Sequence, residues 1–220
     1  MVSLSQKQII LGGLLGDSSL NRKNRTITFT HSIKQKEYLE WKNSFFNAQI
    51  KDALNKWQDK YYPRKYFYYY FNKGNEALFS FLCRNLYSEK RKKISLKYLY
   101  ELDSLGLAIW WLDDGNISNG EKTRFGKLST HCFNYEEHIL LQKYFKERWN
   151  INVAIKKEKD KYYFLRLNVT ELKKLISIIY IHVCEIPSMI YKIDLPYVYR
   201  KRIGKDFIDI YDYINSKKLV

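Results

Sequence analysis

Two apolar segments that end in acid decide the fold: Ile10-Leu11-Gly12-Gly13-Leu14-Leu15-Gly16-Asp17 and Leu107-Ala108-Ile109-Trp110-Trp111-Leu112-Asp113-Asp114-Gly115. Their closing aspartates, Asp17 and Asp114, lie 97 residues apart (114 − 17). The apolar runs predict two helices. The spacing of Ser and Gln in Ser5-Gln6-Lys7-Gln8 predicts a capping box at the start of the first helix, and Asp103-Ser104 can cap the second. The shared pattern indicates a duplicated protein.

A second pair of motifs supports the duplication. Thr30-His31-Ser32-Ile33 is followed by Thr130-His131-Cys132-Phe133, at an offset of 100 (131 − 31). The same offset relates Glu37 to Glu137 and Phe45 to Phe145. Internal similarity of this kind changes the interpretation of a whole chain. We therefore expect two similar halves, residues 1–91 and 92–220, which pack together without a long flexible linker.

Each half also contains alternating aromatic and β-branched stretches, which predict strands. The candidates are residues 25–31, 65–71, 127–131, 152–156 and 161–167. The expected order of elements in each half is helix, strands, helix, strands, helix. This order predicts an α+β fold with two αββαββα halves and largely antiparallel sheets. We interpret the tyrosine-rich run 66–70 as sheet core with wet hydroxyl edges rather than as a base-stacking surface.

The charge balance indicates a polyanionic partner. The 220 residues carry 39 Lys and Arg against 23 Asp and Glu, a formal charge of +16, while 45% of the residues are hydrophobic. So much apolar material excludes a disordered basic tail. A folded, strongly basic protein favours nucleic acid as its partner. A membrane surface is the weaker alternative, because the chain shows no basic amphipathic helix, lipid anchor or apolar run of spanning length.

Cysteine usage indicates an intracellular protein. Cys83, Cys132 and Cys184 are odd in number and widely spaced, which fits reduced thiols better than a disulfide framework. They lack the paired spacing of a structural zinc site. The amino terminus lacks the pattern of a secretory signal. The sequence leaves open whether the compartment is mitochondrial, phage-host or bacterial cytoplasm.

The two acidic helix ends predict a metal site. A carboxylate at the end of a helix faces the negative end of the helix dipole. Glycines on the first helix, with Gly106 and Ala108 on the second, leave room for the two helices to pack closely and bring Asp17 and Asp114 together. Two adjacent carboxylates resist joint ionisation unless a cation lies between them. Hard oxygen ligands favour Mg²⁺, with Mn²⁺ as a substitute.

Such a site can serve phosphodiester hydrolysis, in which metal ions activate water and stabilise the developing charge. Lysines near the scissile phosphate would assist. The candidates are Lys92, with Lys93 as the alternative, after the first half, and Lys192 after the second.

These residues resemble the LAGLIDADG homing endonucleases, in particular the single-chain type with two motifs that is encoded in introns. Ile10 to Ser18 and Leu107 to Gly115 align with the nine-residue signature, although Ser18 replaces the final glycine and the second copy is bulkier than the consensus. The resemblance implies that the motif helices pack at the interface and that the sheets form a DNA-binding saddle. It also implies that Asp17, Asp114, Lys92 and Lys192 are catalytic, and that the metal is bound at Asp17, Asp114, Gly16 and Asp113.

The implied activity is double-strand cleavage of a long, nearly palindromic DNA target by a monomer, with short 3′ overhangs. Strand residues that can point toward DNA are Arg25, Thr28, Lys65, Lys127, Lys156 and Arg166. His31 and His131 fall near the expected cleavage centre, but we interpret both as structural histidines.

Two other functions remain open. A protein of the same fold could bind without cutting, as an RNA splicing maturase acting on its own intron RNA or as a DNA-binding regulator. The presence of both Asp17 and Asp114 favours nuclease activity over a regulator. A ribosome-associated RNA-binding module would need neither the acids nor the duplication.

Overall fold

The first half of the chain has the predicted order of helices and strands. The computed structural model describes residues 2–53, 63–88, 91–119, 124–159 and 161–194. The elements of the first half are α1 (Leu4–Leu15), β1 (Ser19–Asn21), β2 (Thr26–Ser32), the 3₁₀ turn η1 (Ile33–Gln35), α2 (Lys36–Ser44), β3 (Lys51–Asp52), β4 (Arg64–Tyr70), η2 (Lys73–Asn75) and α3 (Glu76–Leu86).

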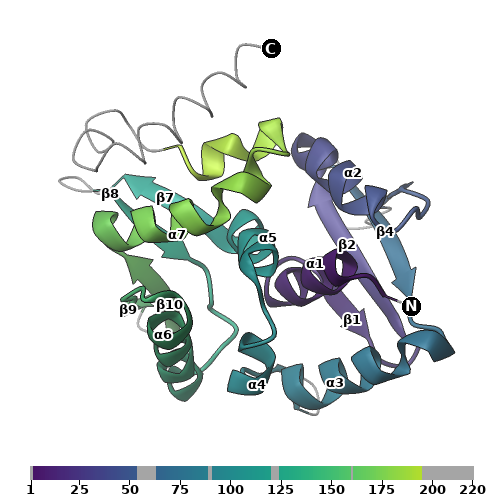
Figure 1. Ribbon diagram of the computed structural model, residues 1–220, viewed down its shortest axis with the longest axis horizontal. Helices are drawn as coiled ribbons and strands as arrows, with labels where there is room; N and C mark the ends of the chain where they lie inside the picture. Colours follow the sequence, from purple (N-terminus) through teal and green to yellow (C-terminus); the bar gives the residue numbers. More distant parts are fainter. Residues whose placement is uncertain (1, 54–62, 89–90, 120–123, 160, 195–220) are drawn as a thin grey trace.

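The second half repeats this order. Its elements are α5 (Ser104–Asp114), β7 (Gly115–Asn119), β8 (Arg124–Leu128), α6 (Tyr135–Trp149), β9 (Ala154–Glu158), β10 (Tyr162–Leu167), α7 (Val169–Val183) and η3 (Pro187–Lys192). The two four-stranded antiparallel sheets have equivalent strand orders, β1-β2-β4-β3 and β7-β8-β10-β9. In Figure 1 the helices α1 and α5 lie side by side at the centre, between the two sheets. The fold is therefore the α+β duplication that the sequence predicts.

A short hairpin connects the halves. Strand β5 (Tyr87–Ser88) pairs with β6 (Arg91–Lys92), and α4 (Leu96–Leu99) follows. The predicted boundary between residues 91 and 92 falls inside β6 and stays a prediction. Residues 195–220 of the second half lie outside the described residues.

The N-terminal cap of α1 differs from the prediction, whereas that of α5 agrees with it. Ser3, rather than Ser5, caps α1: its hydroxyl accepts from the Gln6 N–H while the Gln6 side chain accepts from the Ser3 N–H. The capping box thus lies two residues earlier than expected, which satisfies the backbone donors of the first turn. Asp103 caps α5 as predicted, accepting from the N–H groups of Leu105 and Gly106.

Close packing between α1 and α5 depends on glycine. A Cβ atom added at Gly12 would lie 2.2 Å from the carbonyl oxygen of Gly106 and 2.8 Å from the Cβ of Ile109. A Cβ at Gly16 would lie 2.4 Å from the Cβ of Asp113. The two helix backbones therefore touch, and their C-terminal ends lie together.

Substituting Gly12→Ala should destabilise the protein by about 1–3 kcal/mol, because the new methyl group meets backbone atoms that cannot move independently. Urea denaturation followed by circular dichroism measures this change. Gly74→Ala, where the nearest atom is the Asn72 side-chain oxygen at 3.3 Å, is the matched control and should change stability by less than about 0.5 kcal/mol. Equal effects of the two substitutions would contradict the close helix contact.

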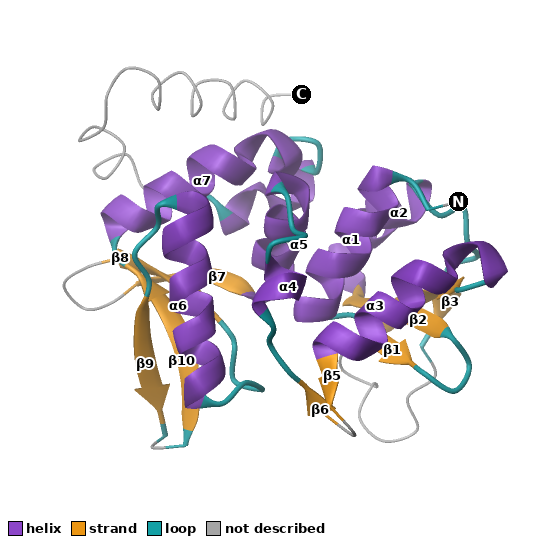
Figure 2. Ribbon diagram, turned by 60° about the horizontal axis from the view of Figure 1, so that its bottom comes forward, coloured by secondary structure: helices purple, strands orange, loops and turns teal. Residues whose placement is uncertain are grey.

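In the part of the chain that the structure describes, helices cover one face of each sheet and leave the other face open. Figure 2 shows the helices in one layer and the strands in a second layer beneath them. Ile27, Phe29 and Phe67 lie on the covered face and are fully buried, as are Leu165 and Leu167 in the second sheet. Alternate residues point away from the helices. The sequence predicted this alternation, although β8 begins and ends three residues earlier than the predicted strand 127–131.

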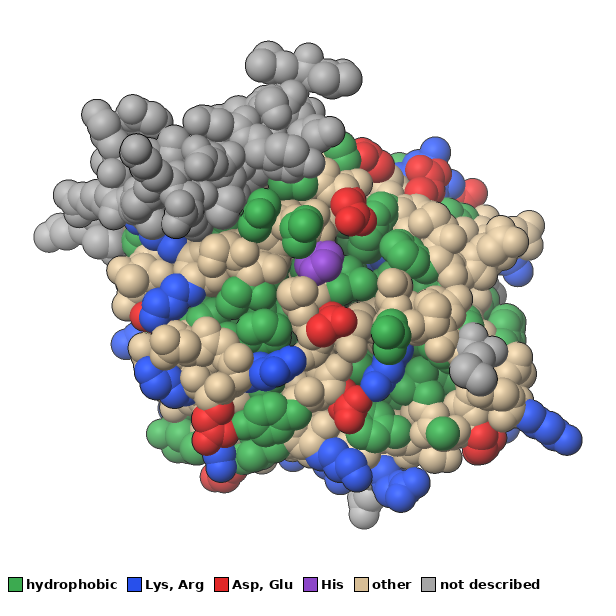
Figure 3. All heavy atoms as spheres, viewed as in Figure 1, with side chains coloured by type: hydrophobic (Ala, Val, Ile, Leu, Met, Phe, Trp, Pro, Cys, Tyr) green, Lys and Arg blue, Asp and Glu red, His purple; other side chains and the backbone are tan. Residues whose placement is uncertain are grey.

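Among the described residues, every helix is too short or too polar to cross a bilayer. Figure 3 shows acidic and basic side chains interspersed over the face that carries the helices.

Candidate metal centre and nucleic-acid surface

Asp17 and Asp114 stand at the adjacent ends of the two central helices. Asp114 is the last residue of α5, and Asp17 follows the end of α1 at Leu15, just beyond the cap residue Gly16. The Asp17 side chain is 43% exposed. Partial burial, then the nearby charge of Asp113, raises the pKa of Asp17 to about 6. Burial, then the charges of Asp113 and Asp17, raises the pKa of Asp114 to about 8. The site therefore disfavours two ionised carboxylates without a cation.

Two lysines lie at these helix ends. Lys92 Nζ donates to the carbonyl oxygens of Gly16, at 3.3 Å, and of Ser18, at 3.1 Å. Lys192 Nζ donates to the carbonyl oxygen of Gly115 at 2.7 Å. Burial lowers the pKa of both lysines, and the neighbouring aspartates oppose that effect. Of the two alternatives after the first half, the structure brings Lys92 to the aspartates.

The Asp113 carboxylate is buried, and both of its oxygens accept hydrogen bonds. The sequence did not reveal these contacts. Asp113 Oδ1 accepts from Lys42 Nζ at 2.8 Å and from the Tyr38 hydroxyl at 2.9 Å. Its Oδ2 accepts from the backbone N–H of Asp17 at 3.2 Å. The side chains of Lys42 and Asp113 are both completely buried. Asp113 thus connects α2 of the first half to the end of α1, and its carboxylate is engaged by Lys42 rather than open to a cation.

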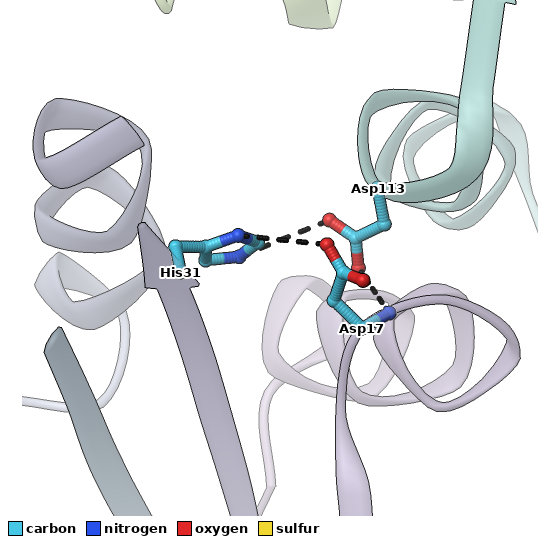
Figure 4. Close-up of side chains that lie close together, drawn as sticks. All are labelled: Asp17, His31 and Asp113. Atoms are coloured by element: carbon cyan, nitrogen blue, oxygen red, sulfur yellow. Dashed lines mark hydrogen bonds and ion pairs between the residues drawn. The ribbon is translucent and has the colours of Figure 1, made fainter. Parts of the chain in front are cut away.

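His31 lies between this ion pair and Asp17. Its Nε2 is 2.9 Å from Lys42 Nζ, and its Nδ1 is 3.7 Å from Asp17 Oδ2 (Figure 4). Burial, then the charge of Lys42, lowers the pKa of His31 to about 3, so the ring is neutral. The ring nitrogen Nδ1 is buried and makes no hydrogen bond among the described residues.

The spacing of Tyr38 and Lys42 is the feature of the sequence that could have revealed this cluster. They are four residues apart, so both lie on one face of α2, which they share with buried Leu39. A lysine on the apolar face of a helix requires a buried partner. The partner is 71 residues away in the chain, so sequence alone did not identify it.

The two repeated histidines are not structurally equivalent. His31 belongs to β2 and its side chain points into the protein, whereas His131 follows the end of β8 and bonds to Glu158 Oε2 at 3.1 Å. His131 also lies beside the rings of Tyr162 and Phe164. A small shift in register places a side chain on the opposite face of a sheet. The structural role of both histidines stays a prediction, and His31 lies next to the candidate metal ligand Asp17.

The donor groups near the helix ends suit a hard divalent cation. Asp17 and Asp114 offer carboxylate oxygens, and carbonyl oxygens of the helix ends lie close by. Asp17, His31 and Asp113 also offer one ligand atom each within 4.8 Å of one another. Lys42 already neutralises Asp113, however, so Asp17 and Asp114 are the groups whose charge a cation would balance. The raised pKa values of these two residues fit that role.

The open face of the second sheet carries three of the predicted DNA-binding residues. Lys127 pairs with Arg166 across β8 and β10, and Lys156 pairs with Phe164 across β9 and β10, so all of these share one face. Lys127 Nζ also bonds to Glu158 at 2.8 Å. Arg166 stacks on Phe125, with its guanidinium carbon 4.3 Å from the ring centroid. This face is cationic and aromatic.

The open face of the first sheet is mostly uncharged. Thr28 pairs with Ser19 and with Tyr68, and it therefore shares that face with them. Lys65 pairs with His31, which places it on the helix-covered side, and it bonds to Asp52 at 2.7 Å. Arg25 bonds to Glu76 at 2.6 Å and lies over the Phe79 ring. Of the predicted contacts in this half, only Thr28 lies on the open face.

Comparisons with known proteins agree with this architecture. Residues 7–175 match the model of the LAGLIDADG DNA endonuclease family. Two curated relatives are RecA proteins, from Mycobacterium shimoidei (30% identical; 54% of this chain, 27% of the relative) and Mycolicibacterium chitae (32%; 53% and 27%). This chain thus spans about a quarter of their length. A third relative, an uncharacterized protein of Methanocaldococcus jannaschii, is 27% identical over 76% of this chain and 65% of its own.

Two solved structures share the fold. The homing endonuclease I-WcaI bound to its DNA recognition sequence superposes with a TM-score of 0.74 at 19% identity, covering 89% of this chain and 88% of that one. Full-length DUF199/WhiA from Thermatoga maritima superposes with a TM-score of 0.52 at 15% identity, covering 98% and 68%. At these identities the likeness concerns the fold alone. The family match spans most of the chain, and the protein belongs to the LAGLIDADG DNA endonuclease family.

Proposed function

We propose that this protein is a site-specific endonuclease that makes a double-strand break in a long DNA target and leaves short 3′ overhangs. The observation that carries the proposal is the meeting of Asp17 and Asp114 at the ends of α1 and α5, with Lys92 and Lys192 bonded to the same helix ends. Family membership supports nuclease activity.

The proposed cofactor is Mg²⁺, for which Mn²⁺ can substitute. Asp17 and Asp114 would hold it, with backbone oxygens of Gly16 and Asp113 nearby. Such an ion activates water and stabilises charge at a scissile phosphate. Lys92 and Lys192 place positive charge beside the same helix ends, where it can hold a phosphate oxygen or the departing oxygen. The acids and lysines come from both halves, so each DNA strand would meet one acid.

The proposed partner is double-stranded DNA, bound along the open faces of the two sheets by one monomer. The internal duplication matches a nearly palindromic target, because each half then meets one half-site. The cationic face of the second half would read bases and hold phosphates through Lys127, Lys156 and Arg166. The first half would present Thr28 and the tyrosine hydroxyls beside it. Its own intron RNA is a further candidate partner.

A cleavage selection tests the proposal. The purified chain is incubated in Mg²⁺ with a library of intron-insertion junctions, and the ends of cut molecules are sequenced. We expect one enriched target with both strands cut and 3′ overhangs, and no cutting in EDTA. Absence of cutting in Mg²⁺ and in Mn²⁺, with specific DNA or intron RNA still bound, would instead establish the non-cleaving alternative: a splicing maturase or a DNA-binding regulator of the same fold.

A further inference from the structure

A buried chain of polar contacts leads to Asp17. It begins at Asp113, which holds Lys42, and continues from Lys42 Nζ to His31 Nε2 at 2.9 Å. It ends at His31 Nδ1, which faces Asp17 Oδ2 at 3.7 Å (Figure 4). The side chains of Asp113, Lys42 and His31 are at most 1% exposed, so water does not compete for these contacts.

The chemistry of Lys42 decides which nitrogen of His31 carries the proton. Lys42 is ion-paired with a buried carboxylate and is therefore an ammonium, which has three donors and no acceptor. Its neighbour Nε2 must accept the hydrogen bond. A neutral imidazole has one acceptor and one donor nitrogen, so the proton lies on Nδ1. The remaining Lys42 proton has the Tyr38 ring beside it, with Nζ 4.2 Å from the centroid.

We propose that His31, locked by Lys42 and Asp113 as the Nδ1–H tautomer, is a positioning residue that orients the Asp17 carboxylate. Its Nδ1 lies 3.7 Å from Asp17 Oδ2, and the Gln35 side chain is a further polar neighbour of the ring. Asp113 Oδ2 also accepts a hydrogen bond from the backbone N–H of Asp17. The buried Lys42–Asp113 ion pair therefore positions the main chain of Asp17 directly and its side chain through His31.

The second half has no equivalent arrangement among its described histidines. The groups that act most on Asp114 are Asp113, Asp17, Lys92 and Lys192. His131 is bonded to Glu158, buried His138 has Thr130 Oγ1 as its Nε2 partner, and His182 Nε2 lies 2.9 Å from Ser104 Oγ at the opposite end of α5. The two acids are therefore chemically inequivalent in spite of the duplication. This inference rests on the proposed function, and it predicts that the two DNA strands depend differently on His31.

The first test measures the tautomer without DNA or metal. Long-range ¹H–¹⁵N correlation spectra report which ring nitrogen is protonated, and the chain has only four histidines to assign. We expect His31 to be the Nδ1–H tautomer in the wild-type protein and to shift toward Nε2–H in Lys42→Met. A wild-type His31 protonated on Nε2 overturns the proposal. This result is independent of cleavage.

The second test measures the two strands separately on one duplex with a different label on each. His31→Phe keeps an aromatic ring, although a larger one, and removes both nitrogens; it should slow one strand relative to the other by on the order of tenfold, because the Asp17 carboxylate loses the Nδ1–H that faces it at 3.7 Å. His31→Asn keeps an N–H donor at the position of Nδ1 and should restore most of the ratio. Equal slowing of both strands, or no rescue by His31→Asn, overturns the proposal.

His138→Phe is the matched control, because His138 is also completely buried and lies in the other half. It should lower the melting temperature and leave the strand ratio unchanged. If the wild-type protein cuts no DNA at all, the proposed function fails, and the tautomer measurement alone decides whether the Lys42–His31 contact exists as described.

Discussion

Replacing Asp17 with asparagine should lower the rate of double-strand cleavage by on the order of 10³-fold, and Asp114→Asn should do the same. An amide keeps the size of the carboxylate but loses its charge, and the electrostatic contribution of a bound metal ion to the transition state is several kcal/mol. DNA affinity should stay the same or rise, because the raised pKa values of both acids mark a site that already repels further negative charge. Single-turnover cleavage and a binding titration in Ca²⁺ measure the two effects.

Asp103→Asn is the control for this prediction. Asp103 caps the opposite end of α5, and asparagine caps a helix about as well as aspartate. The control should cut DNA at the wild-type rate. If either Asp17→Asn or Asp114→Asn still cuts both strands normally, the roles assigned to these carboxylates are wrong.

Removing the buried charge of Lys42 should have the largest effect on stability. Lys42→Met leaves the Asp113 carboxylate buried without its partner, a change that costs about 3–5 kcal/mol. For a protein of this size the melting temperature should fall by roughly 6–20 °C. Denaturant unfolding and calorimetry measure the loss.

Lys36→Met is the control on the same helix. Lys36 is half-exposed and pairs with Glu40 one turn away, so its removal should change stability by no more than about 0.5 kcal/mol. The double variant Lys42→Met with Asp113→Leu should be more stable than Lys42→Met alone, because it removes the uncompensated charge, although Tyr38 and the Asp17 N–H lose their acceptor. A double variant no more stable than the single one would show that the two charges are not coupled.

Local patterns in the sequence were sufficient for the architecture. The apolar segments that end at Asp17 and Asp114 predicted the two central helices, and the alternating stretches predicted β2, β4, β8, β9 and β10 within a few residues. The strands β1, β3 and β7 were not predicted as individual segments. Backbone hydrogen bonds and side-chain periodicity act over short separations, so a pattern of this kind is visible without the fold. Gly12 was likewise recognisable as a contact residue, because a missing side chain on an apolar helix face indicates a close neighbour.

The prediction of DNA contacts was less accurate, for a physical reason. Lys65 and Thr28 both occur in alternating stretches, yet their strand partners place them on opposite faces of the first sheet. The face of a residue depends on register, and register depends on pairing with a strand far away in the chain. The sequence predicted that Arg25 could point toward DNA, but in the fold Arg25 forms an ion pair with Glu76.

The sequence by itself determined the duplication, the two acidic helix ends and the basic character of the protein. Each of these depends only on the types of residue and on their spacing along the chain. Only the tertiary structure decided that Lys42, His31 and Asp113 form one buried cluster beside Asp17. Burial removes water and makes each charge depend on a specific partner, and those partners come from β2, α2 and α5. The asymmetry between the two acids is therefore a property of the folded protein.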